Sequence, residues 1–81
     1  HAELAARAPY DLIFANILKG PLLALAEDIT QALAPGGAAI LSGILNEQAD
    51  EVIARYVACG NNLTQRQEIG DWTSLTLHKA G

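Results

Sequence analysis

The feature that most constrains the fold of this chain is an uninterrupted apolar run near its start. Leu12 to Ala15 are all apolar, and they lie within a segment, residues 10–16, that has the length of a β-strand. A strand whose apolar residues do not alternate with polar ones is expected to be covered on both faces. Such strands are typical of parallel sheets with helices on each side. The segment therefore predicts an α/β fold.

The next two segments continue that pattern. Residues 17–33 carry apolar side chains at helical spacing, and the Pro-Gly-Gly turn at 35–37 ends the predicted helix. The apolar stripe of this helix is Leu18, Leu22, Leu25, Ala26, Ile29 and Leu33. Residues 38–44 predict a second apolar strand, and Asn46 begins a second helix, with acidic residues early in it that favour the helix dipole.

The end of the chain is more polar and predicts a hairpin. Residues 63–69 and 72–79 read as two mixed strands with Gly70-Asp71 between them. The predicted order is strand, helix, strand, helix, strand, strand. The first three strands belong to right-handed crossover units of a parallel sheet, and the last strand is antiparallel. This order is that of one half of a doubly wound α/β domain.

Composition excludes several classes of function. The net charge is −4 and the five basic residues are scattered, which argues against direct binding of nucleic acid or an anionic membrane. Cys59 is the only cysteine, and His1 and His78 lie at opposite ends, so no disulfide or metal site is expected. No apolar run approaches the roughly 20 residues of a membrane span. A cytoplasmic protein is expected, and the lack of an initiator methionine suggests either a piece of something longer or a processed start.

Three segments then resemble a known family. Ala15-Asn16-Ile17-Leu18-Lys19-Gly20-Pro21-Leu22, Leu41-Ser42-Gly43-Ile44-Leu45 and Asp71-Trp72-Thr73-Ser74-Leu75 are similar to segments of the ribosomal protein L11 methyltransferase family. That family belongs to the class I S-adenosylmethionine-dependent methyltransferases, whose parallel sheet ends in an antiparallel strand. The similarity covers residues 10–79, and its specific part is the pair of motifs around residues 15–18 and 41–45.

The resemblance implies a domain organisation and a chemistry. Residues 10–81 would form the C-terminal half of a Rossmann-like methyltransferase domain, and residues 1–9 a linker or the tail of a helix. The family's glycine-rich loop, its acidic residue after the second strand and its N-terminal substrate domain have no counterpart here. The implied cofactor is S-adenosylmethionine, with most of its contacts outside this chain. The implied substrate is a ribosomal protein, methylated on lysine or N-terminal amines.

Asn16 is the candidate catalytic residue. It ends the first strand, and ligands of open α/β sheets bind beyond the carboxyl ends of the strands. Taken from its position alone, it is more simply the N-cap of the following helix. The resemblance reverses that preference, because the family's matching Asn lies near the methyl donor and the incoming amine. Its amide oxygen would then orient the amine, and together with Ile17 it would contact the cofactor.

Four further residues are candidates for binding the substrate: Leu18, Ser42, Gly43 and Trp72. Ile17 and Leu18 stand where many amino-methyltransferases carry Pro-Pro-aromatic, although a core position suits Leu18 better than this role does. Ser42 and Gly43 either line a substrate channel or form a bulge. Trp72 either walls the active site or covers the sheet, and the second role is the commoner one for a large ring.

Two other hypotheses stay open at this point. The chain could come from another Rossmann-like nucleotide-binding protein, such as an oxidoreductase or a regulatory binding module. It could also be catalytically silent by itself. The strand at residues 10–16 expects a neighbour on each side, and an unpaired apolar edge favours self-association.

Overall fold

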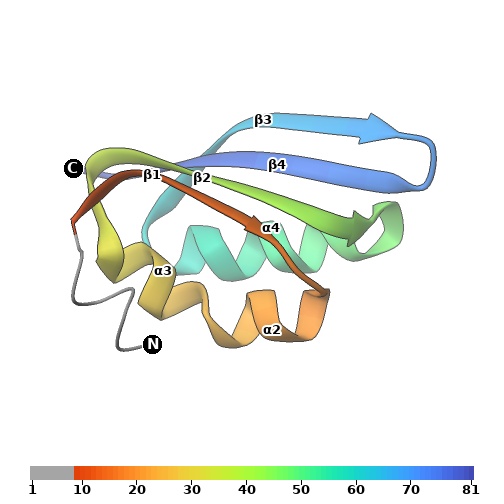
Figure 1. Cartoon of the computed structure of the whole chain (residues 1–81), viewed down its shortest axis with the longest axis horizontal. Helices are drawn as coiled ribbons and strands as arrows, with labels where there is room; N and C mark the ends of the chain where they lie inside the picture. The colour runs from red at the N-terminus through yellow and green to blue at the C-terminus, as the bar shows by residue number, and fades with distance from the viewer. Residues whose placement is uncertain (1–8) are drawn as a thin grey trace.

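The computed structural model describes residues 9–81 as one sheet with helices packed on it (Figure 1). The prediction of a linker at residues 1–9 therefore lies, apart from Pro9, outside the described residues. The elements in chain order are β1 (Tyr10–Asn16), α2 (Lys19–Ala24), α3 (Ala26–Ala32), β2 (Leu33–Leu45), a 3-10 turn (Asn46–Gln48), α4 (Ala49–Ala58), β3 (Asn61–Ile69) and β4 (Trp72–Lys79). The predicted alternation of strands and helices is confirmed.

The four strands form a single sheet in the order β1-β2-β4-β3. β1 pairs with β2 in parallel, and β4 pairs antiparallel with both β2 and β3. Hence β1, β2 and β3 run in the same direction, and β4 runs against them from a central position. The predicted antiparallel final strand is confirmed. β4 is inserted between β2 and β3, so His78 lies on an inner strand and is half-buried.

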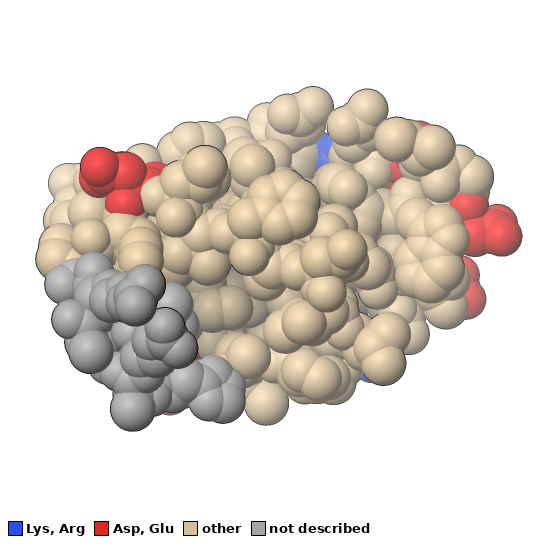
Figure 2. Space-filling view, viewed as in Figure 1, with Lys and Arg blue, Asp and Glu red and all other residues tan. Residues whose placement is uncertain are grey.

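The expectation that β1 is covered on both faces is wrong for this chain. Leu12 is 56% exposed and Phe14 is 66% exposed, whereas Ile13 and Ala15, which point to the other face, pack against the core. Figure 1 shows the reason, since α2, α3 and α4 all lie on one side of the sheet. Within residues 9–81, no helix covers the opposite face of the sheet. In the view of Figure 2, charged side chains lie at the margins of the face and its middle is uncharged.

The segment predicted as one helix, residues 17–33, forms two short helices. Leu25 separates α2 from α3, with φ −91° and ψ 0°, outside the regular helical range. The bond from the Leu25 amide to the Pro21 carbonyl and the bond from the Ile29 amide to the Leu25 carbonyl keep the two helices connected. Leu18 was predicted to belong to the apolar stripe, but it precedes the first turn and is 70% exposed.

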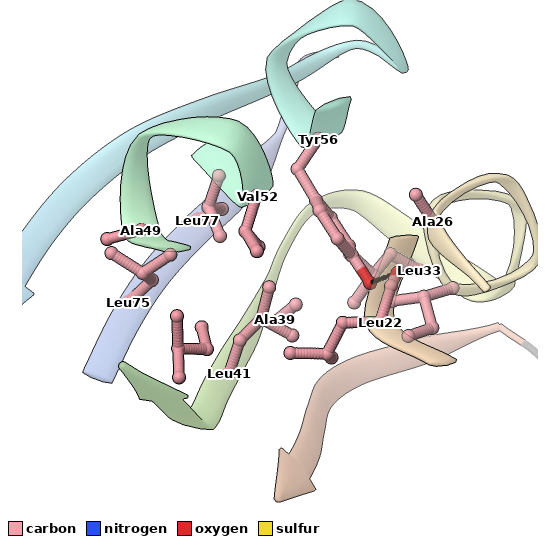
Figure 3. Close-up of a cluster of buried hydrophobic side chains, with 12 residues drawn as sticks. Leu22, Ala26, Leu33, Ala39, Leu41, Ala49, Val52, Tyr56, Leu75 and Leu77 are labelled. Atoms are coloured by element: carbon pink, nitrogen blue, oxygen red, sulfur yellow. Dashed lines mark hydrogen bonds between the residues drawn. The ribbon is translucent and has the colours of Figure 1, made fainter. Parts of the chain in front are cut away.

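The core lies between the three helices and the covered face of the sheet (Figure 3). It is almost entirely aliphatic, as the low aromatic content requires. Its largest member, Tyr56, is fully buried and donates a hydrogen bond of 2.8 Å from its hydroxyl to the Leu22 carbonyl, which joins α4 to α2. The other buried apolar residues of the cluster are Leu22, Ala26, Ile29, Leu33, Ala39, Leu41, Ile44, Ala49, Val52, Leu75 and Leu77.

A buried polar cluster fixes the end of α4. Asn61 is 2% exposed, and its Nδ2 donates to the Tyr56 carbonyl at 2.9 Å and to Thr30 Oγ1 at 2.8 Å. Thr30 in turn donates to the Ala26 carbonyl at 2.7 Å. The asparagine therefore adds a second donor to the Tyr56 carbonyl, which also accepts from the Cys59 amide at 3.2 Å, and ties the last turn of α4 to α3. Within residues 9–81, no helix has the length and apolar character needed to cross a membrane.

Candidate functional site

The site lies at the carboxyl end of β1 and β2, where the sheet meets the start of the helices. Asn16 is the last residue of β1, and its register partner on β2 is Ser42. The parallel pairing carries both side chains to the same edge of the sheet. Ligands of open α/β sheets bind beyond this edge. The strand register therefore places Asn16 and Ser42 side by side.

A bulge in β2 opens the sheet beside these residues. The β2–β4 register steps from Leu41 opposite Leu75 to Ile44 opposite Thr73, so two residues of β2, Ser42 and Gly43, face a single residue of β4. Bulges of this kind bend a strand and re-aim its side chains, and they recur next to active sites. Of the two alternatives considered for these residues, the bulge is confirmed, and the wall of a substrate channel stays a prediction.

Gly43 brings the backbone close to the Asn16 side chain. Its φ is +82°, a conformation that residues with a Cβ rarely adopt. A Cβ at this position would lie 2.8 Å from Asn16 Oδ1 and 3.0 Å from the Ile17 carbonyl oxygen. The bare Cα of glycine leaves room for these two oxygens. Asn16 Oδ1 and the Ile17 carbonyl thus lie side by side against β2 and present two hydrogen-bond acceptors.

An open pocket of about 360 Å³ occupies this corner of the sheet. Four residues predicted from the sequence line it together. They come from β1 (Asn16), the β2 bulge (Ser42 and Gly43) and the start of β4 (Trp72). The pocket is also lined by Thr73 and Ser74, which the sequence analysis missed. Their position directly after Trp72 could have indicated them, but only if the pairing of β4 with β2 had been known.

The other two predicted residues do not line the pocket. The Ile17 side chain is half-buried and packs against the core, and only its carbonyl oxygen lies near the pocket, beside Gly43. Leu18 is the N-cap of α2, without a side-chain cap. The simpler role proposed for Asn16, the N-cap of the following helix, is therefore wrong. The Asn16 side chain is left available at the pocket.

The pocket is electrically neutral. Its six lining residues carry amide, hydroxyl and indole groups, and none of them has an ionisable acid or base. Within residues 9–81, no group of three or more His, Cys, Asp or Glu side chains is placed to hold a metal ion. The arrangement can accept hydrogen bonds from a donor such as an amine and can enclose an uncharged group. Its lining has no general base, so nothing there activates the serine and threonine hydroxyls as nucleophiles.

Part of the wall fits the implied cofactor. The space beside Gly43 is filled by two oxygens of this chain, Asn16 Oδ1 and the Ile17 carbonyl, and both are acceptors suited to a cofactor whose methyl-donor end is positively charged. Asn16 and the Ile17 carbonyl are the groups of this chain that would hold the methyl-donor end of S-adenosylmethionine. The pocket lining has no carboxylate that could bind ribose hydroxyls, so contacts to the nucleoside would come from other residues.

Comparisons with known proteins agree on one family. A family model described as ribosomal protein L11 methyltransferase (PrmA) matches residues 1–80. The ribosomal protein L11 methyltransferase of Caulobacter sp. (strain K31) is 47% identical over 79 residues, which are 98% of this chain and 27% of that protein. The chain thus spans about a quarter of the length of this curated relative.

Solved structures match the same region of the chain. The ribosomal protein L11 methylase of Lactobacillus delbrueckii subsp. bulgaricus superposes with a TM-score of 0.86 at 28% identity, over 96% of this chain and 41% of that one. The M1.HpyAVI–SAM complex superposes with a TM-score of 0.79 at 10% identity, over 98% of this chain and 49% of that one, and this likeness concerns the fold alone. These similarities favour a methyltransferase over the alternative of an oxidoreductase or regulatory module.

Proposed function

Because the chain belongs to the ribosomal protein L11 methyltransferase family, we propose that it forms part of an S-adenosylmethionine-dependent enzyme that methylates amines of ribosomal protein L11. The amines are lysine side chains or the N-terminus. Residues 10–81 are the second half of its catalytic domain, and the enzyme works in the cytoplasm, where its substrate is made. The observation that carries the proposal is the neutral pocket in which Gly43 leaves room for Asn16 Oδ1.

The pocket acts on an amine by orientation. When bound, S-adenosylmethionine supplies a methyl group on a positively charged sulfur. The Asn16 Oδ1 and the Ile17 carbonyl oxygen accept hydrogen bonds from the N–H groups of the incoming amine and leave its lone pair directed away from them. Holding a reactant in the productive direction lowers the barrier by removing rotational and translational freedom. Trp72 and the hydroxyl-bearing residues of β4 form the opposite wall.

The amine must be neutral before it can attack. A lysine with a pKa near 10.4 costs about 4–5 kcal/mol to deprotonate at pH 7. The lining residues contain no base, so the proton leaves to water. A site without a carboxylate also disfavours the ammonium form, because nothing compensates its lost hydration. The residues of this chain therefore select the neutral amine and do not take up its proton.

The test is methyl transfer to L11 by the full-length enzyme that carries this chain. Asn16→Ala is expected to lower kcat by about a hundredfold or more, as loss of an orienting group does. Asn62→Ala, at an exposed asparagine of β3 away from the pocket, is the matched control and should retain activity. The rate should rise with pH throughout the range below the lysine pKa. A plateau below pH 7 would contradict proton loss to water, and an active Asn16→Ala variant would contradict the role of Asn16.

A further inference from the structure

We propose that Asn46 is a positioning residue for this pocket: it holds the Trp72–Thr73 wall at its correct distance from the β2 bulge. The proposal rests on the proposed function, because the wall matters only if the pocket receives a substrate. Asn46 does not line the pocket itself. It follows the last residue of β2 and begins the 3-10 turn that leads into α4.

Three hydrogen bonds connect Asn46 to the β3–β4 hairpin. Its amide N–H donates to the Asp71 carbonyl at 3.0 Å, and its Nδ2 donates to the Gly70 carbonyl at 2.9 Å. Its Oδ1 accepts from Thr73 Oγ1 at 2.7 Å. One residue after the end of β2 thus binds both residues of the hairpin turn and the second residue of β4.

The bulge explains why such a connection is needed. Between Leu41 and Ile44 the β2–β4 ladder loses its regular register, and bulges leave residues unpaired and bend the strand. Beyond the bulge only two pairs, those of Ile44 with Thr73 and Leu45 with Trp72, continue the pairing. The start of β4 also pairs with β3, but so short a stretch fixes it only weakly against β2. The three bonds from Asn46 add a second attachment at the point where the ladder is least regular.

The Thr73 hydroxyl is the link between Asn46 and the pocket. Thr73 is 1% exposed and lines the pocket, and Asn46 Oδ1 is the acceptor for its hydroxyl. A buried hydroxyl that loses its partner must reorient or move toward water. Trp72, its neighbour, is 52% exposed, so contacts cover only part of its surface. Loss of Asn46 would therefore displace the indole wall while leaving Asn16 and Gly43 in place.

The experiment compares substitutions at both ends of this bond in the full-length enzyme. Asn46→Ala and Thr73→Val are expected to raise KM for L11 about tenfold, the cost of a displaced substrate-positioning wall. We expect kcat to change less than threefold and the Kd for S-adenosylmethionine to stay unchanged. Thr73→Ser keeps the hydroxyl and should restore most of the affinity that Thr73→Val loses. Asn62→Ala is the control asparagine.

A purely structural role would give a different result. If Asn46→Ala lowers only the Tm and leaves KM for L11 as in the wild type, the proposal is overturned. Equal changes for Thr73→Ser and Thr73→Val would also overturn it. Trp72 is the single tryptophan of this chain, so quenching of its fluorescence by acrylamide in the 81-residue chain reports the wall without activity. Greater quenching in Asn46→Ala supports the proposal even if the wild-type enzyme fails to methylate L11, and unchanged quenching contradicts it.

Discussion

Asn16 Oδ1 occupies a space that exists only because residue 43 has no side chain. The point where a Cβ of Gly43 would stand is 2.8 Å from that oxygen, and real Cβ atoms essentially never come so close to another heavy atom. The two residues come from different strands and are brought together by the parallel register of β1 and β2. The rotamer of one residue and the backbone conformation of the other therefore depend on each other.

Substitution of Gly43 tests this dependence, and Gly36 offers a matched control. Both glycines have similar positive φ values, +82° and +79°, but a Cβ at Gly36 would meet nothing within 4 Å. Gly43→Ala and Gly36→Ala should each lower the free energy of unfolding by about 1–2 kcal/mol through backbone strain. Only Gly43→Ala should also abolish methyl transfer, because it displaces the Asn16 amide. Equal activity of the two variants would show that Asn16 does not need this space.

Alkaline pH should weaken the fold through Tyr56. Burial raises the pKa of Tyr56 from 10.0 to about 12, and the charge of Cys59 adds to this effect while that of Arg55 opposes it. The folded chain thus holds the phenol proton more tightly than the unfolded chain does. Its contribution to stability is complete below pH 10 and is lost as the pH rises through about 12.

The measurement uses a Tyr10→Phe background, so that Tyr56 is the only remaining tyrosine. Phenolate absorbance should then appear only as the chain unfolds. Addition of Tyr56→Phe removes the bond to the Leu22 carbonyl and should cost about 1 kcal/mol at pH 7. It should also flatten the fall in stability between pH 10 and 12. Phenolate absorbance at pH 10 in a chain that is still folded would contradict the burial of the hydroxyl.

Asn61 should not tolerate a negative charge. A carboxylate there would face the Tyr56 carbonyl, to which Asn61 now donates, and it would be almost completely buried. We expect Asn61→Asp to lower the free energy of unfolding by about 3 kcal/mol or more at pH 7. Burial raises the pKa of such a carboxyl, so the loss should shrink as the pH falls and the group is protonated. Asn62→Asp, one residue further along β3 and exposed, should change stability by about 0.5 kcal/mol or less. Urea unfolding of both variants would distinguish them.

The uncovered face of the sheet should make the 81-residue chain self-associate. Leu12 and Phe14 are exposed on β1, which is an edge strand, and an exposed apolar edge is a template for pairing. Phe14→Thr should shift the sedimentation profile toward the monomer. Val57→Thr removes an apolar side chain of 47% exposure from α4, on the covered side of the molecule, and should have little effect. A monomeric wild-type chain at high concentration would argue against association through this face.

Much of the architecture was predictable because local patterns determine it. The bounds of β1 follow from its apolar run, and those of β4 from its mixed strand pattern and from the Gly70-Asp71 turn before it. The break of the first helix at Leu25 was not predictable, because nothing in the local sequence marks it. The exposure of one face of β1 was missed for a different reason. Whether a strand is covered depends on how many helices cross the sheet, and an apolar run cannot report that number.

The part of the site that lies at the end of a single strand was predictable. The part that forms where several strands meet was not. Asn16 and Ser42 follow from the parallel register, while Thr73 and Ser74 enter the pocket through the position of β4 beside β2. Strand order is a long-range property of the chain. Asn46 was identified in sequence only as the start of a helix, and its bonds to the hairpin turn become visible only in three dimensions.

The central place of β4 has a consequence for how the chain folds. β4 is the last of the four strands in sequence, and β2 and β3 share no ladder except through it. Among β1 to β4, only β1 and β2 can pair before β4 is synthesised, because β3 pairs with β4 alone. Sheet formation therefore waits for contacts between distant parts of the sequence, and such contacts slow folding. During translation, β3 would therefore stay unpaired until β4 leaves the ribosome, which is the particle whose protein we propose the enzyme modifies.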